Sequence, residues 1–556
     1  MKSKRHLGAW PPMLAHELEY PEVPLFQLLD IAAYMYPGLT AINYYGKEVS
    51  YRELKKSVDH LAGALKKRGI EKNDKVIVYM QNSPQFVIAF FAVMRANAVA
   101  IPVNPIWQSD ELKFVLEDSG ATAVICLSDV AVNVEEIKDE VNLKAVIVSD
   151  YKDYLPEEPL ISIPGFMKKD YDAKGFELWS DVLEEKEAPP EVIVGMEDLA
   201  MIPYTSGTTG VPKGCMHSHQ TLIANPVGVT HWMRLTAGSV HLSSLPFFHV
   251  TGLVISCLAV VFSAGTMVIF SRWDKEAAID AIEKLQCNYW AAITAMVVDF
   301  LTLPDIESRD FSSLRGAVGG GAPMPEAVWQ QFKKVTGLSF IEGYGLTESS
   351  SATHINPPQQ VKFQCLGIPD FGVDARLIDP DTLEEILEAN KQGEIILNGP
   401  EIFLGYWNRP EDNEKSFIEV DGKRFFRTGD LAYVDEEGYF FLVDRTKRMI
   451  NAAGFKVWPA EVENYLYKHP DVLEACVVGI PDPKRGENTR AYIVLKPDSA
   501  NKVKPEDIIE WSKGQMAAYK YPREVIFVDS LPKGATGKIL WKQVQDEAIK
   551  EMEKNS

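Results

Sequence analysis

The chain has 556 residues, 46% of them apolar, and a formal net charge of −21. This length exceeds the size at which one hydrophobic core stops growing, so at least two domains are expected. The acidic charge and the lack of a basic patch argue against binding to nucleic acid or to an anionic membrane surface. Anionic ligands must then be bound by local lysines and arginines.

Six scattered cysteines form no Cys-x-x-Cys pair, which favours reduced core thiols over a zinc site or a disulfide framework. We therefore expect a cytoplasmic protein. The basic N-terminus is not followed by an apolar run of signal-peptide length, so secretion is not expected. Only residues 253–270 approach the length of a membrane span, and Ala264, Gly265 and Thr266 divide them into a helix, a turn and a strand. No transmembrane segment is expected.

Strands and helices are predicted to alternate along most of the chain. A hairpin is expected over residues 41–45 and 48–51, followed by a helix over 52–68. Further strands are predicted at 75–80, 98–103, 122–126, 145–148, 239–245, 265–270 and 339–342. Residues 151–196 are rich in proline and charge, and we expect them to be a surface excursion.

The last part of the chain is predicted to be a smaller unit. A strand at 438–443 precedes it, and helices at 459–468 and 505–516 alternate with strands at 472–480 and 490–495. We expect an α/β fold with a large domain at 1–443, a linker at 444–447 and a second domain at 448–556.

The run YTSGTTGVPKG at 204–214 has the composition of a loop that binds polyphosphate. Its glycines let backbone N–H groups approach an anion, and its lysine adds positive charge. It is not a Walker A loop, because Pro212 precedes the lysine and Gly214 follows it. The candidate phosphate ligands are Thr205, Ser206, Gly207, Thr208, Thr209 and Lys213.

Four more motifs follow in order: YGLTES at 344–349, TGDL at 428–431, DRTK at 444–447 and PKGATGK at 532–538. Five motifs in one order are far more specific than any one of them. Together they resemble the adenylate-forming superfamily of acyl-CoA synthetases, luciferases and adenylation domains, over nearly the whole chain. The chain is most similar to short- to medium-chain or fatty acyl-CoA synthetases. The resemblance implies a large domain of several subdomains, including a small distorted β-barrel, and a small mobile C-terminal domain.

The resemblance also implies the reaction. A carboxylic acid reacts with ATP to form an acyl-adenylate and pyrophosphate, and CoA then takes the acyl group. Lys538 would bridge the carboxylate and the α-phosphate in the transition state, while Lys213 and its loop hold the other phosphates. Glu348 would be the magnesium ligand, since a carboxylate oxygen suits a cation that shares its shell with phosphates and water.

Nucleotide recognition is expected around the second and third motifs. Tyr344 would stack on the purine. Asp430 would accept the ribose hydroxyls, and Arg445 would supply a forked donor to the ribose or its phosphate. The other nucleotide-binding residues that the resemblance implies are Gly321, Ala322, Gly343, Gly345 and Thr347.

His249, in LPFFHVTG at 245–252, matches the position that guards the carboxylate and the thiol entrance in the family. We interpret it as a gate rather than a base. The acyl chain is expected to pass Thr251, Val298, Gly320 and Gly345. Acetate-specific relatives carry tryptophan at the last position, so glycine favours a longer, hydroxylated or aryl acid, and Gly345→Trp is expected to exclude longer acids.

Lys447 matches the hinge about which the small domain of the family swivels between the half-reactions. Gly454 would line the pantetheine tunnel, where a side chain would block passage. Asn451 and Ala453 stand where coumarate ligases and luciferases carry lysines. This difference argues against a coumarate ligase or a luciferase and favours an aliphatic acyl-CoA synthetase.

Alternative functions stay open on the sequence. The adenylate could pass to a carrier-protein thiol, the substrate could be an aryl acid, or the chain could be a nucleotide-binding regulator without catalysis. The presence of Lys538, Glu348 and Lys213 disfavours the last. His217 and His219 lack a visible third ligand, so no zinc is proposed. The sequence also leaves a homodimer open.

Overall fold

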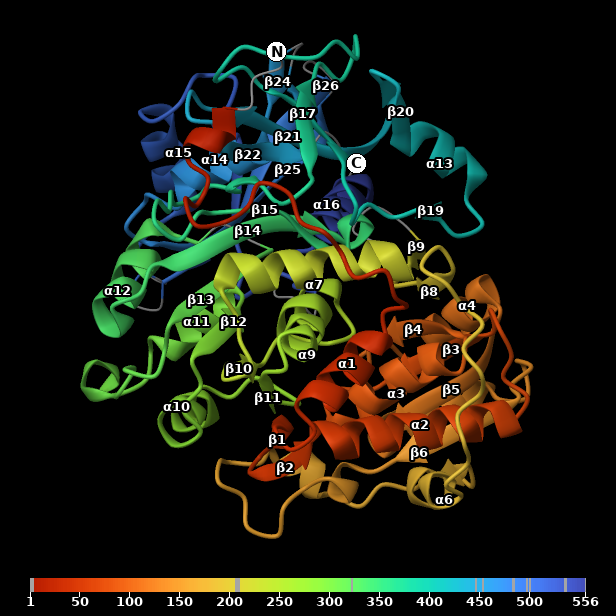
Figure 1. Ribbon diagram of the computed structural model, residues 1–556. Helices are drawn as coiled ribbons and strands as arrows, with labels where there is room; N and C mark the ends of the chain where they lie inside the picture. Colours follow the sequence, from red (N-terminus) through yellow and green to blue (C-terminus); the bar gives the residue numbers. More distant parts are fainter. Residues whose placement is uncertain are drawn as a thin grey trace.

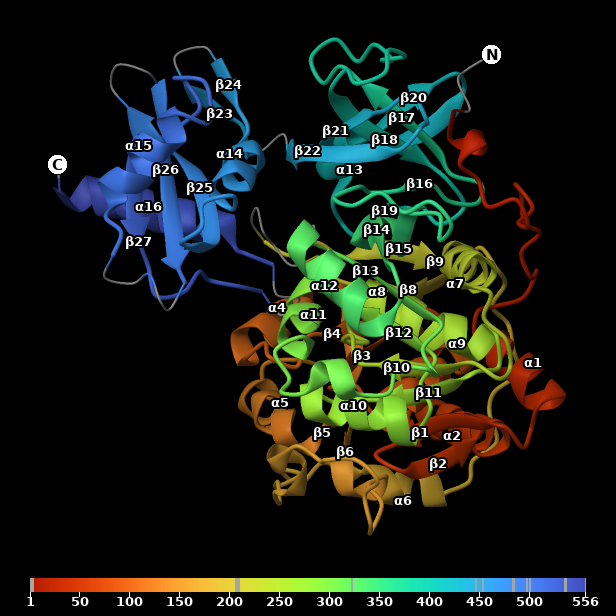
Figure 2. The same ribbon diagram turned by 90° about the vertical axis from the view of Figure 1, so that its left-hand side faces the viewer.

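The computed structural model describes residues 5–205, 211–321, 324–445, 448–452, 455–482, 486–496, 499, 502–534 and 538–555. The chain up to β22 (Phe440–Arg445) forms a large part, and the chain from β23 (Ile450–Ala452) onward forms the small part drawn in blue in Figure 2. This mixed α/β architecture confirms the predicted fold class. The domain limits stay a prediction, because β22 pairs with β21 (Lys423–Val434) as far as Arg445.

One layer of the large part is an eight-stranded sheet in the order β19-β9-β8-β4-β3-β5-β6-β7. Its centre is parallel, and the four strands predicted between residues 75 and 148 are confirmed there. Helix α3 (Pro84–Arg95) packs on it and is buried except at Arg95, as expected for a helix that is apolar on every side. The strands are β3 (Lys75–Tyr79), β4 (Val99–Val103), β5 (Ala121–Leu127), β6 (Ala145–Ser149), β7 (Glu177–Leu178), β8 (Leu199–Met201), β9 (Cys215–Ser218) and β19 (Gly405–Tyr406).

A nine-stranded sheet forms a second layer, in the order β16-β15-β14-β13-β12-β10-β11-β1-β2. Strands β13, β12, β10, β11 and β1 are parallel neighbours, and the predicted strands 239–245 and 265–270 are confirmed. The predicted hairpin, β1 and β2, forms one edge of this sheet. Gly46 permits the turn between the two strands, with a φ of +110°. The strands are β1 (Thr40–Tyr44), β2 (Lys47–Ser50), β10 (Val240–Ser243), β11 (Thr266–Ile269), β12 (Tyr289–Ala292), β13 (Gly316–Gly320), β14 (Phe340–Leu346), β15 (Ser351–Ile355) and β16 (Ile368–Pro369).

Helices cover these sheets (Figure 1). The predicted helix at 52–68 is α2 (Tyr51–Lys67). It begins with a capping box, in which Ser50 Oγ accepts from the Glu53 N–H (3.3 Å) and the Glu53 carboxylate accepts from the Ser50 N–H (2.8 Å). The other α-helices of the large part are α1 (Gln27–Met35), α4 (Ser109–Ser119), α5 (Ala131–Ile137), α6 (Trp179–Glu184), α7 (His219–Met233), α8 (Val250–Leu253), α9 (Ala259–Phe262), α10 (Lys275–Lys284), α11 (Thr294–Phe300), α12 (Glu326–Thr336) and α13 (Pro410–Ser416).

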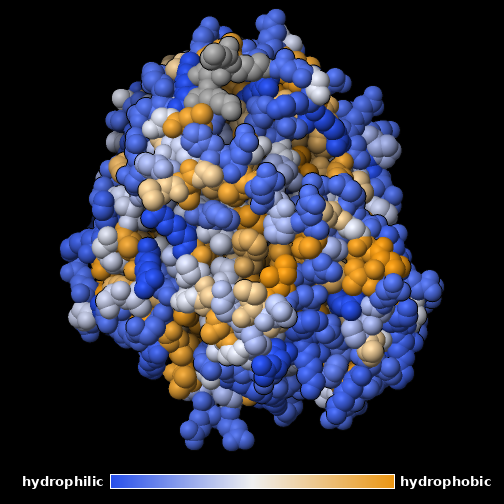
Figure 3. All heavy atoms as spheres, viewed as in Figure 1, coloured by the Kyte–Doolittle hydropathy of each residue, from blue (hydrophilic) through white to orange (hydrophobic). Residues whose placement is uncertain are grey.

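Two segments allow the predicted elements to be compared with the observed ones. Residues 151–196 contain the short helix α6, which the sequence did not predict and which buries Trp179. Residues 253–270 divide as predicted, into the end of α8, a π-helical turn (Val254–Leu258), α9 and β11. Within the described ranges, no helix is long and apolar enough to cross a membrane. The face shown in Figure 3 is mostly hydrophilic, with separate apolar patches.

A third sheet, five-stranded and antiparallel, stands where the resemblance implied a small distorted β-barrel. Its order is β17-β18-β21-β20, with β22 also paired to β21. The predicted strand at 438–443 is confirmed as β22. The other new strands are β17 (Asp374–Ile378), β18 (Gly393–Asn398) and β20 (Phe417–Val420).

The small part has its own sheet and its own buried clusters. All four elements predicted there are confirmed, with boundaries that differ by several residues. The strands are β24 (Phe455–Val457), β25 (Val472–Asp482), β26 (Gly486–Leu495) and β27 (Glu524–Phe527), and the helices are α14 (Pro459–Leu466), α15 (Pro505–Lys513) and α16 (Trp541–Asn555).

Candidate active site

The base of the predicted phosphate loop is fixed between β8 and β9. Tyr204 and Gly214 form a β-bridge. The Thr205 N–H donates to the Lys213 carbonyl (2.9 Å), and the Lys213 N–H donates to Thr205 Oγ1 (3.1 Å). These bonds hold both ends of the loop side by side at the rim of the eight-stranded sheet.

Lys213 and Glu348 both contact the side chain of Tyr406. The Lys213 ammonium lies 5.1 Å from the centre of the Tyr406 ring, and the Tyr406 hydroxyl donates to Glu348 Oε1 (2.7 Å). Lys213 Nζ also forms an ion pair with Asp412 of α13. Tyr406 reaches both groups because β19 pairs with β9, which follows the phosphate loop directly. The predicted phosphate lysine and the predicted magnesium ligand are thus brought together.

Backbone contacts fix the turn that carries Thr347 and Glu348. This turn is the 3₁₀ helix η7 (Thr347–Ser349), directly after β14. The Phe403 N–H donates to the Glu348 carbonyl (2.8 Å), and His217 Nε2 donates to the Thr347 carbonyl (2.8 Å). Burial lowers the pKa of His217 to about 4, so the ring is neutral at pH 7. His217 is therefore a structural tie between β9 and the turn.

His219 faces a different partner from His217. Its Nδ1 accepts from the Leu25 N–H (3.1 Å), and burial lowers its pKa to about 4. Over the residues that the structure covers, no group of three or more His, Cys, Asp or Glu side chains could hold a metal ion. The two histidines are thus used separately, each to anchor a backbone segment.

The predicted adenosine-binding residues meet at β14, β21 and β22. Asp430 is 1% exposed, and its carboxylate accepts from the Tyr344 hydroxyl (2.7 Å) and pairs with Arg445 Nε (2.9 Å). Gly320, predicted to line the acyl pocket, pairs with Gly343 across β13 and β14, so the predicted acyl-pocket and nucleotide-binding residues are neighbours here. A carboxylate has about four acceptor positions, which leaves Asp430 capacity for further hydroxyl donors.

Lys538 comes from the small part and lies within this group of charges. The neighbouring Arg445 and burial lower the pKa of the Lys538 ammonium to about 8, and Arg448 acts in the same direction. Asp430 and Asp444 oppose this shift. Lys538 is separated from Asp430 by more than a hundred residues of sequence. Only the docking of the small part against the large part brings them together.

His249 lies within reach of the same lysine. Burial and, to a smaller extent, the charge of Lys538 lower the pKa of His249 to about 4. His249 Nδ1 accepts from the Thr251 N–H (3.3 Å), so the neutral ring carries its proton on Nε2. A neutral imidazole that is already bonded at Nδ1 can donate from Nε2 to a carboxylate, but it is a poor base at pH 7. This agrees with a gate rather than a base.

The predicted acyl pocket shows one important difference from expectation. A Cβ atom on Gly345 would lie 1.7 Å from the Ser351 carbonyl oxygen, and one on Gly320 would lie 2.3 Å from the Gly343 carbonyl oxygen. Both glycines therefore allow strands to approach closely. Gly345 itself is exposed, but a Cβ atom there would point at the backbone of β15 rather than into free space. Thr251 is half-buried in α8, and Val298 on α11 is 42% exposed.

Several predicted site residues lie outside the described ranges, and the predictions made for them are unchanged. They are Ser206, Gly207, Thr208, Thr209, Ala322, Lys447 and Gly454.

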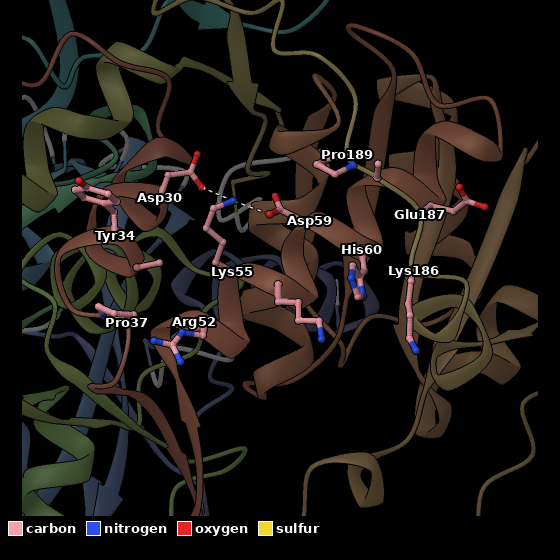
Figure 4. Close-up of a pocket in the computed structure, with 13 residues that line it drawn as sticks. Asp30, Tyr34, Pro37, Arg52, Lys55, Asp59, His60, Lys186, Glu187 and Pro189 are labelled. Atoms are coloured by element: carbon pink, nitrogen blue, oxygen red, sulfur yellow. Dashed lines mark hydrogen bonds and ion pairs between the residues drawn. The ribbon is translucent and has the colours of Figure 1, made fainter.

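A surface pocket of about 500 Å³ lies far from these residues, between α1, α2 and residues 186–189 (Figure 4). Lys55 in this pocket pairs with Asp30 (3.1 Å) and with Asp59 (2.6 Å). The charge of Lys55 is thus compensated, and none of the predicted site residues lines this pocket.

Three residues of the site were missed in the sequence: Tyr406, Asp412 and Arg448. Tyr406 and Asp412 belong to GYWNRPED at 405–412, and Arg448 directly follows DRTK. Tyr406 and Asp412 lie far along the chain from the groups they contact. The aromatic and acidic residues at 405–412 were the available signal, but only the pairing of β19 with β9 gives them a partner.

Comparison with known proteins identifies the family. The chain matches the model described as AMP-binding enzyme over residues 29–407, and the model described as AMP-binding enzyme C-terminal domain over residues 461–538. It is 32% identical to a long-chain-fatty-acid–CoA ligase of Bacillus subtilis over 98% of each chain. It is 33% identical to a feruloyl-CoA synthase of an Amycolatopsis species, over 92% of this chain and 96% of that one. ATP-bound MatB from Rhodopseudomonas palustris has a similar structure, with a TM-score of 0.84 at 26% identity over 95% of this chain and 99% of MatB.

The chain therefore belongs to the AMP-binding enzyme family. It is an AMP-forming acyl-CoA synthetase, an acid–thiol ligase whose small-molecule substrates are a carboxylic acid, ATP and CoA.

The residues present fit the Mg²⁺ that accompanies ATP in this family. Magnesium is usually held by one or two carboxylates together with substrate phosphates and water. Glu348 offers a single carboxylate, with one oxygen bonded to Tyr406 and Lys213 beside the same ring. Such a site needs no protein cage, because ATP brings most of the ligands.

The ion pair between Lys213 and Asp412 predicts that Asp412 competes with ATP. In Asp412→Asn, Lys213 is released, and the KM for ATP should fall roughly two- to fivefold, which corresponds to the ~0.5–1 kcal/mol of a partly exposed ion pair. Glu411→Gln removes the same charge from an exposed position of the same helix and should leave the KM unchanged. Equal effects of the two variants in pyrophosphate exchange would point to the overall field instead.

The contact of Gly345 predicts a loss of stability on substitution. Gly345→Ala should lower the free energy of unfolding by about 1–3 kcal/mol or more, because its Cβ would collide with the Ser351 carbonyl. Gly38→Ala is the control, because a Cβ there would meet no atom within 4 Å. Denaturant unfolding measures both. A stable Gly345→Trp variant that accepts only acetate would restore the simple pocket-size explanation.

The pKa of Lys538 predicts an alkaline limb in the rate profile. With a pKa of about 8, Lys538 loses its positive charge as the pH rises, so kcat/KM for pyrophosphate exchange should fall above about pH 8. Lys538→Arg should be slower but should lack this limb, because the guanidinium keeps its proton. A limb at the same pH in both proteins would assign the titration to another group.

Proposed function

We propose that this acyl-CoA synthetase forms its acyl-adenylate where Lys538 meets Asp430, Arg445 and His249. The observation that carries the proposal is the position of Lys538, which lies close enough to Arg445, Asp430 and His249 for their charges to act on one another. The substrate carboxylate and the α-phosphate of ATP are both anions. Positive groups fixed between them lower the free energy of the transition state.

In the first half-reaction, a carboxylate oxygen of the acid attacks the α-phosphorus of ATP. The bond from that phosphorus to the bridging oxygen breaks, and pyrophosphate leaves with the electron pair. Lys538 stabilises the charge that develops between the two reactants. Lys213 binds the departing phosphates once Asp412 has released it. Glu348 would hold Mg²⁺, which would neutralise phosphate charge.

In the second half-reaction, the thiol of CoA attacks the carbonyl carbon of the adenylate, the proton of the thiol is lost and AMP leaves. His249 lies at the thiol entrance and acts there as a neutral hydrogen-bond donor. Lys447 serves as the hinge of the small domain, and Gly454 lines the path of the pantetheine arm. These last two assignments rest on the sequence motifs alone.

For the acid itself we propose an aliphatic substrate longer than acetate, with a hydroxylated acid included. The absence of lysine at Asn451 and Ala453 and the similarity to a long-chain-fatty-acid–CoA ligase support this choice. An aryl acid is the second candidate, because a feruloyl-CoA synthase is 33% identical over most of the chain. A panel from acetate to dodecanoate, with hydroxy acids and ferulate, assayed for CoA-dependent AMP release, separates the two. Preferred turnover of acetate would contradict both.

We also propose that the enzyme works in the cytoplasm. All six cysteines are buried and unpaired, as expected in a reducing compartment. A homodimer is a further proposal, made from the sequence only. Light scattering of the purified protein measures the mass in solution, and a monomer would reject the dimer.

Lys538→Ala separates the two half-reactions. The variant should slow pyrophosphate exchange roughly 10²- to 10³-fold, because the lost contact acts on charge that develops in the transition state. Thioester formation from supplied acyl-adenylate should persist. Lys533→Ala is the control, because Lys533 belongs to the same motif but pairs with Glu474 of the small part. An unchanged exchange rate in Lys538→Ala would remove this lysine from the mechanism.

A further inference from the structure

Two buried carboxyl groups lie behind η7, apart from the nucleotide-binding residues. Asp370 follows β16 and is 7% exposed, and Glu401 lies between β18 and β19 and is 3% exposed. Within the described chain, neither forms an ion pair with a lysine, arginine or histidine. Asp370 Oδ1 accepts from the Phe371 N–H (2.8 Å), whereas Glu401 Oε1 has no hydrogen-bond partner.

The other buried acids of the described chain all have donors. Glu394 pairs with Arg427, Asp430 with Arg445, and Asp444 with Arg448. Glu342 accepts from two backbone N–H groups, those of Met324 (3.0 Å) and Gln364 (3.1 Å). A buried carboxylate without a counter-charge costs several kcal/mol by the usual estimate of ion desolvation. Asp370 and Glu401 thus differ from the other buried acids, because no positive group among the described residues compensates their charge and their hydrogen bonds are incomplete.

Both carboxyl groups line one small cavity of about 10 Å³, together with Tyr20 and Asn225. This space is close to the minimum that holds a single water-sized particle, roughly 10–15 Å³. Burial raises the pKa of Asp370 to about 7 and, with the nearby charge of Asp370, that of Glu401 to about 8. Burial and, to a smaller extent, the charges of both carboxyl groups raise the pKa of the Tyr20 hydroxyl. The three acidic groups therefore lie close to one another around the cavity.

We propose that Asp370 and Glu401 bind one hard metal cation larger than Mg²⁺, such as Ca²⁺ or K⁺, in this cavity. All the side chains named at the site offer oxygen ligands, which calcium and potassium prefer. Magnesium fits poorly because it keeps several water molecules, for which the cavity has no room. The cation supplies the missing positive charge and gives the unpartnered Glu401 Oε1 a ligand to bind.

The location suggests what the cation does. Asn225 of α7 donates to the Ser349 carbonyl (2.8 Å) at the end of η7, and Glu401 lies two residues before Phe403, whose N–H donates to the Glu348 carbonyl (2.8 Å). Tyr20 belongs to the N-terminal segment, which runs along the outside of the large part beside α7 (Figure 2). A bound cation would therefore tie this segment to the back of the turn that carries Glu348, without entering the active site.

Thermal unfolding without nucleotide tests the proposal. Protein stripped of metal is measured at about pH 8.5, above both pKa values, with Ca²⁺, K⁺, Na⁺ or Mg²⁺ at constant ionic strength. Ca²⁺ or K⁺ should raise the Tm of the native protein by on the order of 2–4 °C. Mg²⁺ should have a smaller effect. Elemental analysis of the native protein should find about one such cation per chain.

Two variants and a control make the test specific. Glu401→Gln and Asp370→Asn should each abolish the rise caused by the cation and should raise the Tm of metal-free protein, because an unpaired charge is removed. Glu394→Gln breaks a buried pair with Arg427, so it should lower the Tm but keep the response to the cation. Two outcomes overturn the proposal. One is no response to any cation, which would mean that protons alone neutralise the pair, and the other is an equal response in Glu401→Gln.

Discussion

The site depends on positive charge held where two anions must meet. Arg445 is the largest cause of the lowered pKa of Lys538, and Arg448 adds to it. The protonated lysine is therefore unfavourable in the absence of substrate, and an anion placed beside it removes that cost. The same groups that destabilise the empty site thus favour a carboxylate and a phosphate. Asp430 keeps part of this charge balanced until the ligands arrive.

The end of β14 and the turn that follows it contact residues of the other two sheets of the large part. Tyr344 in the strand contacts Asp430, the Thr347 carbonyl accepts from His217, and the Glu348 carboxylate accepts from Tyr406. Three sheets therefore meet at five successive residues, 344–348. This explains why the family motif is short and dense, because a shift of one residue would move the nucleotide, phosphate and metal ligands together.

The sequence predicted the layers and the motifs but not their mutual contacts. Mainly apolar runs of four to six residues identified β3 to β6 because buried parallel strands are apolar on both faces. Helix α6 was missed because it is short and lies in a polar segment. Tyr406 and Asp412 carry no periodic signal, and their roles arise only from the pairing of β19 with β9. At Gly345 we predicted room for the acyl chain, but the glycine also permits the close approach of β15, which only the structure reveals.

A buried carboxylate of the large part contacts the small part. Asp444 of β22 accepts from the Ala460 N–H at the start of α14 (2.7 Å), and burial raises the pKa of Asp444. Any rotation that withdraws Lys538 moves the whole small part, α14 included, so this contact must break. Once broken, the carboxylate regains water, which offsets much of the lost bond. If the small part turns about Lys447 as proposed, the contact would therefore orient it without locking it, and the anions bound at Lys538 would decide which arrangement is favoured.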